Sequence, residues 1–314
     1  MRIFACSNCR HTVFFENVQC LNCQKELGFS PDQGMLALPH EGLHKCRNYS
    51  EHNVCNWLTR QPGDYCRACR LNRTIPDLDQ PGNLHRWWRL EVAKKRLVFS
   101  LVELQLPLDD LQFDFLVPGP QPVLTGYSNG LITINAVEAD DSTREKMRVD
   151  MNELYRTLLG HFRHESAHHY WTVLVQDLPA FRQVFGDERQ SYQECMDRHY
   201  KNGPPTDWQE QGFISAYASM HPWEDWAECW AHYLHMHDTL QTALEFGLGR
   251  PERATFDDMV QDWGRLTFAL NSINRSMGIS DLYPFVLSKS VLEKLRWIHH
   301  LLEGAPRSLA KQKE

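Results

Sequence analysis

The spacing of hydrophobic residues predicts a long helix followed by a small sheet in the first half of the chain. Helical periodicity covers residues 84–106 and stops before Pro107. "FDFLV" then has the composition of a short strand. "LITIN" alternates apolar and polar residues after Asn129-Gly130, a dipeptide suited to a tight hairpin turn. We expect "LITIN" to be a strand that can pair with an extended peptide.

The rest of the chain has a helical pattern. One helix is expected to run from about Ser142 to residue 175 without a break. Further helical segments are expected over residues 179–186, 188–201, 222–245, 256–277 and 287–303. The predicted fold class is therefore α+β, a mostly helical body with a small sheet.

Composition and charge exclude several classes of protein. Hydrophobic residues make up 42% of the 314 positions and charged residues 23%, which is typical of a globular chain. The formal charge of −7 disfavours a nucleic-acid-binding protein. The sequence has no apolar run long enough for a membrane span and does not begin with a signal-peptide pattern. We expect a cytoplasmic protein, in which cysteines bind metals more often than they form disulfides.

Eight of the ten cysteines lie within the first 69 residues, in two groups of four. In the first group, two CxxC pairs are separated by ten residues, and each tight turn directs two thiolates at one point. This spacing predicts a structural zinc ion in a zinc ribbon over residues 1–28, with iron as the alternative metal. The expected ligands are Cys6, Cys9, Cys20 and Cys23.

The second group has eight, ten and two residues between successive cysteines. It lies in a poorly apolar segment that cannot bury enough surface to fold without a cross-link. We expect a second structural zinc ion within residues 44–72, with His44 and His52 as substitute ligands. The expected ligands are Cys46, Cys55, Cys66 and Cys69.

A stretch rich in proline and glycine, "TIPDLDQPGN", separates the cysteine groups from the helical body. It predicts a cysteine-rich module over residues 1–78 and a second domain over residues 79–314.

Zinc ribbons bind proteins or nucleic acids, or only maintain a shape. The module's net charge is only about +2, so we favour a protein partner over nucleic acid.

"HFRHESAHHYW" contains the pattern HExxH, which is typical of zinc hydrolases. His164 and His168 are four residues apart and lie on one face of a helix, so they can bind one zinc ion. Glu165 lies about 100° around the helix, where it can accept a proton from a zinc-activated water. We interpret His161 as a packing residue or a residue supporting a ligand. We expect His169 to point away from the metal.

A third ligand must come from another helix, and the best segment is residues 215–238. Glu224 and Glu228 lie on one face of the helix that we expect to begin near Pro222. We predict that Glu224 binds zinc and that Glu228 hydrogen-bonds a ligand histidine. Three other residues of this segment remain competing ligands: His221, Asp225 and His232.

The combination of motifs resembles a known family. "YRTLLGHFRHESAHHYW" and "HPWEDWAECWAHYLH", after two cysteine groups and "CRACRLNRTIPDL", resemble the bacterial zinc-ribbon, zinc-binding metallopeptidases over nearly the whole chain. "HESAH" followed by "EDWAE" is similar to the gluzincin arrangement. The resemblance implies a zincin-like domain in which His164, His168 and Glu224 bind zinc and Glu165 is the general base.

Two further expectations follow from this resemblance. Some gluzincins place a tyrosine seven residues before the ligand glutamate, and Tyr217 occupies that position here. The resemblance implies that the Tyr217 hydroxyl stabilises the oxyanion of the reaction intermediate. Glu224 lies 56 positions after His168, a longer separation than in thermolysin-like enzymes. This implies an inserted helical segment, about 178–205, that shapes or covers the cleft.

The predicted function is a zinc metallopeptidase with one catalytic and two structural zinc ions and a peptide or protein substrate. The alternative is a catalytically silent adaptor, in which the cysteine groups bind protein or nucleic acid and the zincin-like domain is a scaffold. Such an adaptor is expected to have lost the glutamate of HExxH, and Glu165 is present.

Overall fold

The computed structural model describes residues 2–250 and 255–304. The chain forms two compact units, here called the first unit (residues 1–162) and the second unit (residues 163–306). The predicted domain boundary near residue 78 stays a prediction. No described helix has the length and apolar character needed to cross a membrane.

The elements of the first unit are short strands, helices and two 3-10 helices. In the cysteine-rich part they are β1 (Phe4–Ala5), β2 (Thr12–Val13), β3 (Leu27–Ser30), β4 (Gly34–Ala37), β5 (His44–Lys45), α1 (Arg47–His52), β6 (Leu58–Thr59), η1 (Cys69–Leu71) and β7 (Asn72–Thr74). They are followed by α2 (Asn83–Glu103), β8 (Gln112–Leu116), β9 (Gly126–Ser128), β10 (Leu131–Asn135), η2 (Ala136–Ala139) and α3 (Asp141–Asp150).

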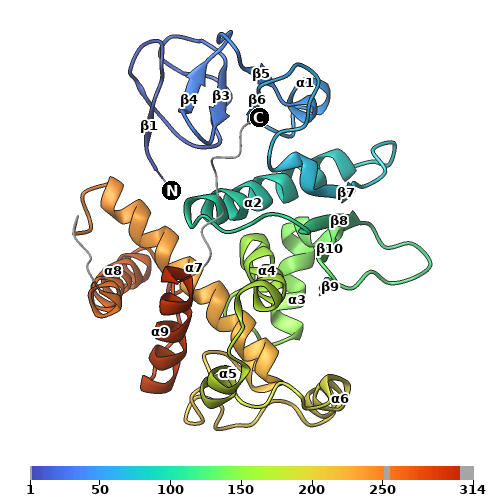
Figure 1. The fold of residues 1–314 in the computed structure, drawn as a ribbon, viewed down its shortest axis with the longest axis vertical. Coiled ribbons are helices and arrows are strands. Elements are labelled where there is room, and N and C mark those ends of the chain that lie inside the picture. The colour runs from blue at the N-terminus through green and yellow to red at the C-terminus, as the bar shows by residue number, and fades with distance from the viewer. Residues whose placement is uncertain (1, 251–254, 305–314) are drawn as a thin grey trace. The chain divides into compact units, whose positions relative to one another are not determined.

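Helix α4 (Leu158–Leu174) begins in the first unit and continues into the second. The remaining elements of the second unit are α5 (Leu178–Phe185), α6 (Tyr192–Asn202), η3 (Tyr217–Ser219), α7 (Pro222–Glu245), α8 (Phe256–Ser276) and α9 (Lys289–Glu303). Figure 1 shows α8 and α9 beside the long helix α7, and α5 also packs on α7. The α+β fold class and the helical segments expected in this half are confirmed.

The small sheet has the strand order β7-β8-β10-β9. The hairpin between β9 and β10 forms as predicted, with positive φ at Asn129 (47°) and Gly130 (84°). A side chain at Gly130 would lie 2.2 Å from the carbonyl oxygen of Asp110, so the turn requires glycine. Strand β10 pairs with β8 on one side and β9 on the other. The expectation that "LITIN" pairs with a peptide is therefore wrong, because both of its edges are occupied.

The single helix expected over residues 142–175 is also wrong, because α3 and α4 are separate helices. Asn152 adopts a left-handed φ of 53°, and the amide of Glu153 donates to the carbonyl of Arg148 (2.9 Å). Asparagine tolerates this conformation better than most residues, so the chain turns here and α4 starts in a new direction.

An aromatic cluster joins the cysteine-rich part of the first unit to α2. Phe15 and Phe29 have ring centroids 4.8 Å apart, and each ring also contacts Trp57 and Phe99. All four side chains are buried. Phe99 belongs to α2, so the cysteine-rich residues and α2 share one hydrophobic core inside the first unit.

A buried carboxylate, Glu138, contacts a histidine and an arginine at the end of the sheet. His161 Nδ1 lies 2.6 Å from Glu138 Oε2, and Arg156 lies 3.4 Å from the same oxygen. Burial alone would raise the pKa of Glu138, but His161, Thr125 and Arg156 lower it to about 2. His161 therefore supports the first unit through Glu138, as a packing residue.

The lowered pKa of Glu138 predicts a pH-dependent contribution to stability. The carboxylate stabilises the folded chain above the unfolded-state pKa of about 4.5, and this contribution disappears as the pH falls toward 2. We expect Glu138→Gln to lower the free energy of unfolding at pH 7 by about 3 kcal/mol. Denaturant unfolding of both proteins between pH 3 and 7 measures this difference. A difference that stays constant over this range would contradict the ionised pair.

Candidate metal centres

The first four-cysteine group forms a compact cluster of thiols. The Sγ atoms of Cys6 and Cys23 are 3.8 Å apart, and those of Cys9 and Cys20 are 3.6 Å apart. Four ligands at 2.3 Å in a tetrahedron lie about 3.8 Å from one another, whereas disulfide sulfurs are about 2 Å apart. The spacing therefore fits a zinc-sized ion and excludes disulfides between these pairs.

The two CxxC turns of this cluster are built alike. In each turn the amide after the second cysteine donates to the carbonyl of the first, from Arg10 to Cys6 and from Gln24 to Cys20, both at 2.9 Å. Arg10 and Gln24 both adopt a left-handed conformation, with φ of 62° and 59°. Each turn thus directs two thiols to one side, as the sequence predicted.

The second group is also brought together. One ligand atom from each cysteine lies within 4.8 Å of the others, and the thiols of Cys55 and Cys66 are 3.7 Å apart. Backbone amides donate to the sulfurs, among them the amide of Cys66 to Cys46 Sγ at 3.2 Å. Such bonds stabilise thiolates, so the cluster fits a structural zinc ion. The substitutes His44 and His52 are not part of it.

Buried charges surround the second cluster. Lys95 is 4% exposed and donates from Nζ to the carbonyl of Val54 (2.9 Å). Glu91 is fully buried, and its Oε2 lies 3.8 Å from Cys69 Sγ. Burial would lower the pKa of Lys95, but the thiols of this cluster together with Glu91 raise it. An ammonium in this position balances the negative charge that four thiolates carry.

In the second unit, two tryptophans fix how α7 packs on α4. Trp226 Nε1 donates to the carbonyl of Ala167 (2.8 Å), and Trp230 Nε1 donates to Ser166 Oγ (3.3 Å). The Trp230 ring also stacks on Tyr170 at 5.3 Å. Both tryptophans are fully buried, so the two helices keep one relative register. This packing directs one face of α7 toward the HExxH residues of α4.

The third candidate centre lies between these helices. His164 Nε2 is 2.9 Å from Glu224 Oε2, and His168 Nε2 is 3.6 Å from Glu224 Oε1. Ligand atoms of the three residues lie within 4.8 Å of one another. Two imidazoles and one carboxylate are a common ligand set for catalytic zinc, and they leave a fourth position for water or substrate.

The charges of this group favour a cation. Burial would raise the pKa of Glu224, but His168, His164 and Tyr192 lower it to about 2. Burial lowers the pKa of His168 to about 4. Glu228 remains ionised as well, because its contact with His164 lowers its pKa although burial would raise it. The buried carboxylate of Glu224 and the half-buried one of Glu228 beside these imidazoles give a group that a divalent cation neutralises.

Glu228 lies where the sequence placed it, behind a histidine. Its Oε1 is 2.7 Å from His164 Nδ1, on the opposite side of the ring from Glu224. Ser215 Oγ donates to the other carboxylate oxygen at 2.6 Å. This contact orients the His164 ring, as is typical of residues that support metal ligands. Ser215 was not predicted, because nothing in the sequence pattern distinguishes it.

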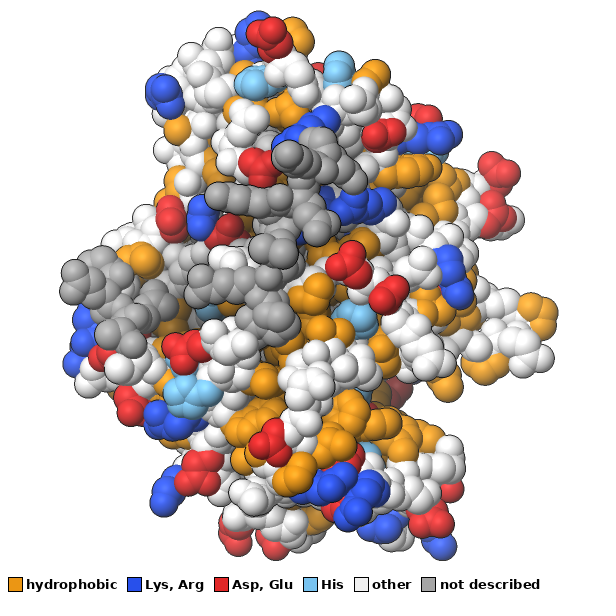
Figure 2. Space-filling view, viewed as in Figure 1, with side chains coloured by type: hydrophobic (Ala, Val, Ile, Leu, Met, Phe, Trp, Pro, Cys, Tyr) orange, Lys and Arg blue, Asp and Glu red, His pale blue; other side chains and the backbone are white. Residues whose placement is uncertain are grey.

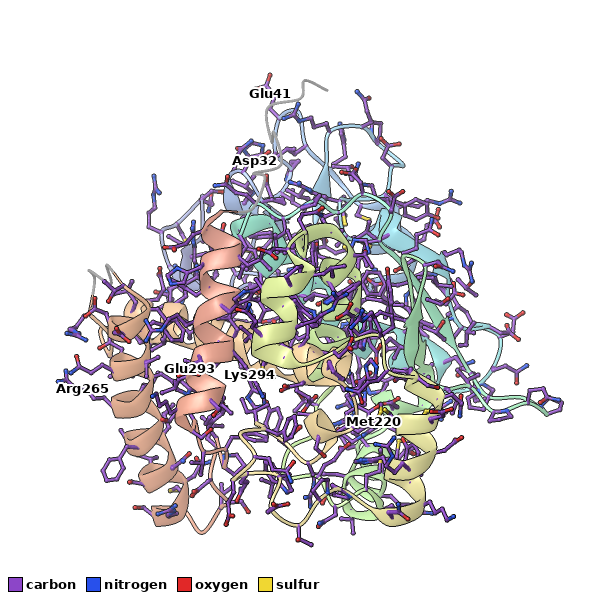
Figure 3. The ribbon with its side chains drawn as sticks, turned by 60° about the horizontal axis from the view of Figure 1, so that its bottom comes forward. Asp32, Glu41, Met220, Arg265, Glu293 and Lys294 are labelled. Atoms are coloured by element: carbon purple, nitrogen blue, oxygen red, sulfur yellow. The ribbon has the colours of Figure 1, made fainter. Side chains whose placement is uncertain are left out.

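The competing ligands of α7 have other partners. Asp225 pairs with Lys294 of α9 (2.7 Å), a residue labelled in Figure 3, and burial raises the pKa of this acid to about 6. His221 caps α7 by accepting from the amide of Trp223 (3.1 Å). His232 Nδ1 lies 2.8 Å from the hydroxyl of Tyr283. None of the three belongs to the metal-binding group among the described residues.

Two tyrosines adjoin Glu224. The hydroxyl of Tyr192 donates to Glu224 Oε1 at 2.9 Å. The ring of Tyr217, the predicted oxyanion donor, lies 5.9 Å from the ring of His164. Burial raises the pKa of Tyr192, as do the charges of Glu224 and Glu165. Tyr192 was missed because no motif of the sequence marks it.

His169 and the two cysteines outside the four-cysteine groups lie in the protein interior. His169 is 3% exposed, and its ring contacts Tyr170 at 5.1 Å. The two cysteines outside the groups, Cys195 and Cys229, are buried thiols. They are not part of any of the three metal-binding groups of the described chain.

Comparison with known proteins agrees with this arrangement. Residues 83–301 match a family described as "Putative zinc-binding metallo-peptidase", and residues 3–80 match a zinc-ribbon domain family. The chain is similar to proteins of Mycobacterium bovis and Mycobacterium tuberculosis that carry the name "uncharacterized protein". Each is 42% identical over 329 aligned positions, which cover 96% of this chain and 96% of the relative. No solved structure shows significant similarity to the chain.

Proposed function

Because the chain belongs to the zinc-binding metallo-peptidase family, we propose that it is a peptidase of the gluzincin type. The single observation that carries this proposal is the convergence of His164, His168 and Glu224 from two helices. Glu165 lies between the two histidines in sequence, in the position of the general base of HExxH enzymes.

Each residue of this centre has a distinct role in the proposed reaction. A zinc ion held by His164, His168 and Glu224 would supply the Lewis acid that polarises the scissile carbonyl and acidifies water. Glu165 accepts the proton of the attacking water on a carboxylate oxygen and then delivers it to the leaving amide nitrogen. Glu228 keeps the His164 ring in one orientation.

Tyr217 is proposed to stabilise the oxyanion. Its ring lies 5.9 Å from the ring of His164. Burial raises the pKa of Tyr217, so the phenol stays protonated and can donate. Such a donor would stabilise the negative charge that develops on the carbonyl oxygen.

The proposed substrate is a peptide or protein, and the cysteine-rich module is proposed to contact a protein partner. On the face drawn in Figure 2, acidic and basic side chains are both present. The formal charge of −7 supports a peptide substrate over the adaptor that binds nucleic acid. We also propose a cytoplasmic location.

The test of this function combines a metal count with an activity assay on the full chain. We expect three zinc ions per chain in the parent protein and two in the His164→Ala/His168→Ala variant, measured by elemental analysis. We expect the parent, but not the variant, to cleave members of a mixed peptide library detected by mass spectrometry. Two zinc ions in both proteins would overturn the proposed centre. If the parent protein bound three zinc ions but cleaved no library member, the peptidase function would be overturned and the catalytically silent adaptor would be favoured.

A further inference from the structure

The inserted segment contributes a side chain to the candidate catalytic centre. Tyr192 is the first residue of α6, and Ser191 caps this helix by accepting from the amide of Glu194 (3.3 Å). The Tyr192 ring contacts His221 at 5.2 Å and Trp223 at 6.4 Å. A helix start and two aromatic contacts thus hold the phenol in place, and its hydroxyl reaches Glu224 at 2.9 Å.

The two oxygens of Glu224 have different surroundings. Oε2 lies 2.9 Å from His164 Nε2. Oε1 accepts the hydrogen bond from Tyr192 and lies 3.6 Å from His168 Nε2. Glu224 is 1% exposed, so water does not compete for the hydrogen bond from Tyr192. A carboxylate with one oxygen bound in this way keeps a fixed orientation relative to the two histidines.

We propose that Tyr192 is a positioning residue that fixes Glu224 in the orientation in which this carboxylate completes the zinc ligand set with His164 and His168. The inference rests on the proposed metal centre and adds a residue to which no motif of the sequence assigns a role. It also gives the inserted segment a function, because α6 supplies the group that orients the third ligand.

The test is the zinc affinity of the full-length Tyr192→Phe variant. Phenylalanine keeps the ring contacts with His221 and Trp223 and removes only the hydroxyl. Loss of a group that supports a metal ligand typically weakens metal binding ten- to a hundredfold. We expect the weakest-bound zinc ion of the variant to have a dissociation constant raised by about this factor, measured by competition with a chromophoric chelator.

The matched control is Tyr233→Phe, on the same helix as Glu224. Tyr233 is 3% exposed, and its hydroxyl lies 2.9 Å from His299 Nδ1. This variant also loses a buried hydrogen bond but does not alter Glu224, so its zinc affinity should equal that of the parent. Thermal unfolding of all three proteins after removal of the weakest-bound zinc shows whether either variant changes the fold.

The outcomes separate this inference from the proposed function. Weaker zinc binding in Tyr192→Phe alone supports the positioning role, whether or not the protein cleaves peptides. An unchanged affinity in Tyr192→Phe, or an equal loss in Tyr233→Phe, would overturn it. If the parent cleaves peptides, we also expect added zinc to restore turnover in Tyr192→Phe. If saturating zinc did not restore turnover in Tyr192→Phe, Tyr192 would take part in the chemical step itself, and the positioning role would be overturned.

Discussion

We expect the Glu165→Gln variant to keep three bound zinc ions and to lose peptide hydrolysis by about a thousandfold or more. Glutamine preserves the size of the side chain but cannot take a proton from water. Glu165 is 9% exposed and is not one of the three grouped ligands, so the metal centre should survive the change. Initial rates on the best-cleaved library peptide and zinc per chain, measured on the same samples, check both statements.

A glutamate outside the centre provides the control for this prediction. Glu210 is exposed and lies in the same unit of the chain. Glu210→Gln should retain the rate of the parent protein and its three zinc ions. Comparable rates in the parent and in Glu165→Gln, with the metal retained, would contradict the role of Glu165 as general base.

The second large effect concerns the second four-cysteine cluster. We expect Cys66→Ser to lower the zinc content from three ions to two and to unfold the cysteine-rich part of the first unit, because a structural zinc contributes folding free energy directly. The buried ammonium of Lys95 would also lose the thiolates that balance its charge. We expect the thermal midpoint of the first unit to fall by about 10 °C or more.

Limited proteolysis and thermal unfolding measure this effect. Cleavage in Cys66→Ser should begin within residues 40–80 under conditions in which the parent resists the protease. Cys195→Ser is the control, since Cys195 is buried in the second unit and belongs to neither cluster. If Cys66→Ser kept three zinc ions and the parent's thermal midpoint, the second cluster would not be a structural metal site.

Much of the candidate chemistry is local in sequence and was therefore predictable. A CxxC turn places two thiols together within four residues, and the observed turns at Cys6–Cys9 and Cys20–Cys23 close by the same hydrogen bond. Likewise, any helix over "HESAH" puts His164 and His168 on one face. The hairpin at Asn129-Gly130 was equally local, because only the turn residues decide it.

Other features depend on contacts between distant segments. In the sequence, several candidate ligands lie within a few positions of one another at and after the start of α7. Side chains at neighbouring positions of a helix point about 100° apart. The packing of Trp226 and Trp230 on α4 sets the rotation of α7, which directs Glu224 to the histidines and Asp225 to Lys294. The strand pairing that closes both edges of "LITIN" is likewise a property of the assembled sheet.

By itself, the sequence determined the paired thiols of the CxxC turns and the histidine pair of HExxH, because cysteine turns and helical spacing are fixed over a few residues. Only the tertiary structure decided which carboxylate completes the histidine pair and what holds that carboxylate. Tyr192 lies 32 positions before Glu224 on another helix, and no periodicity connects them. Their contact exists because the chain between them folds back and buries both groups where water cannot replace the hydrogen bond.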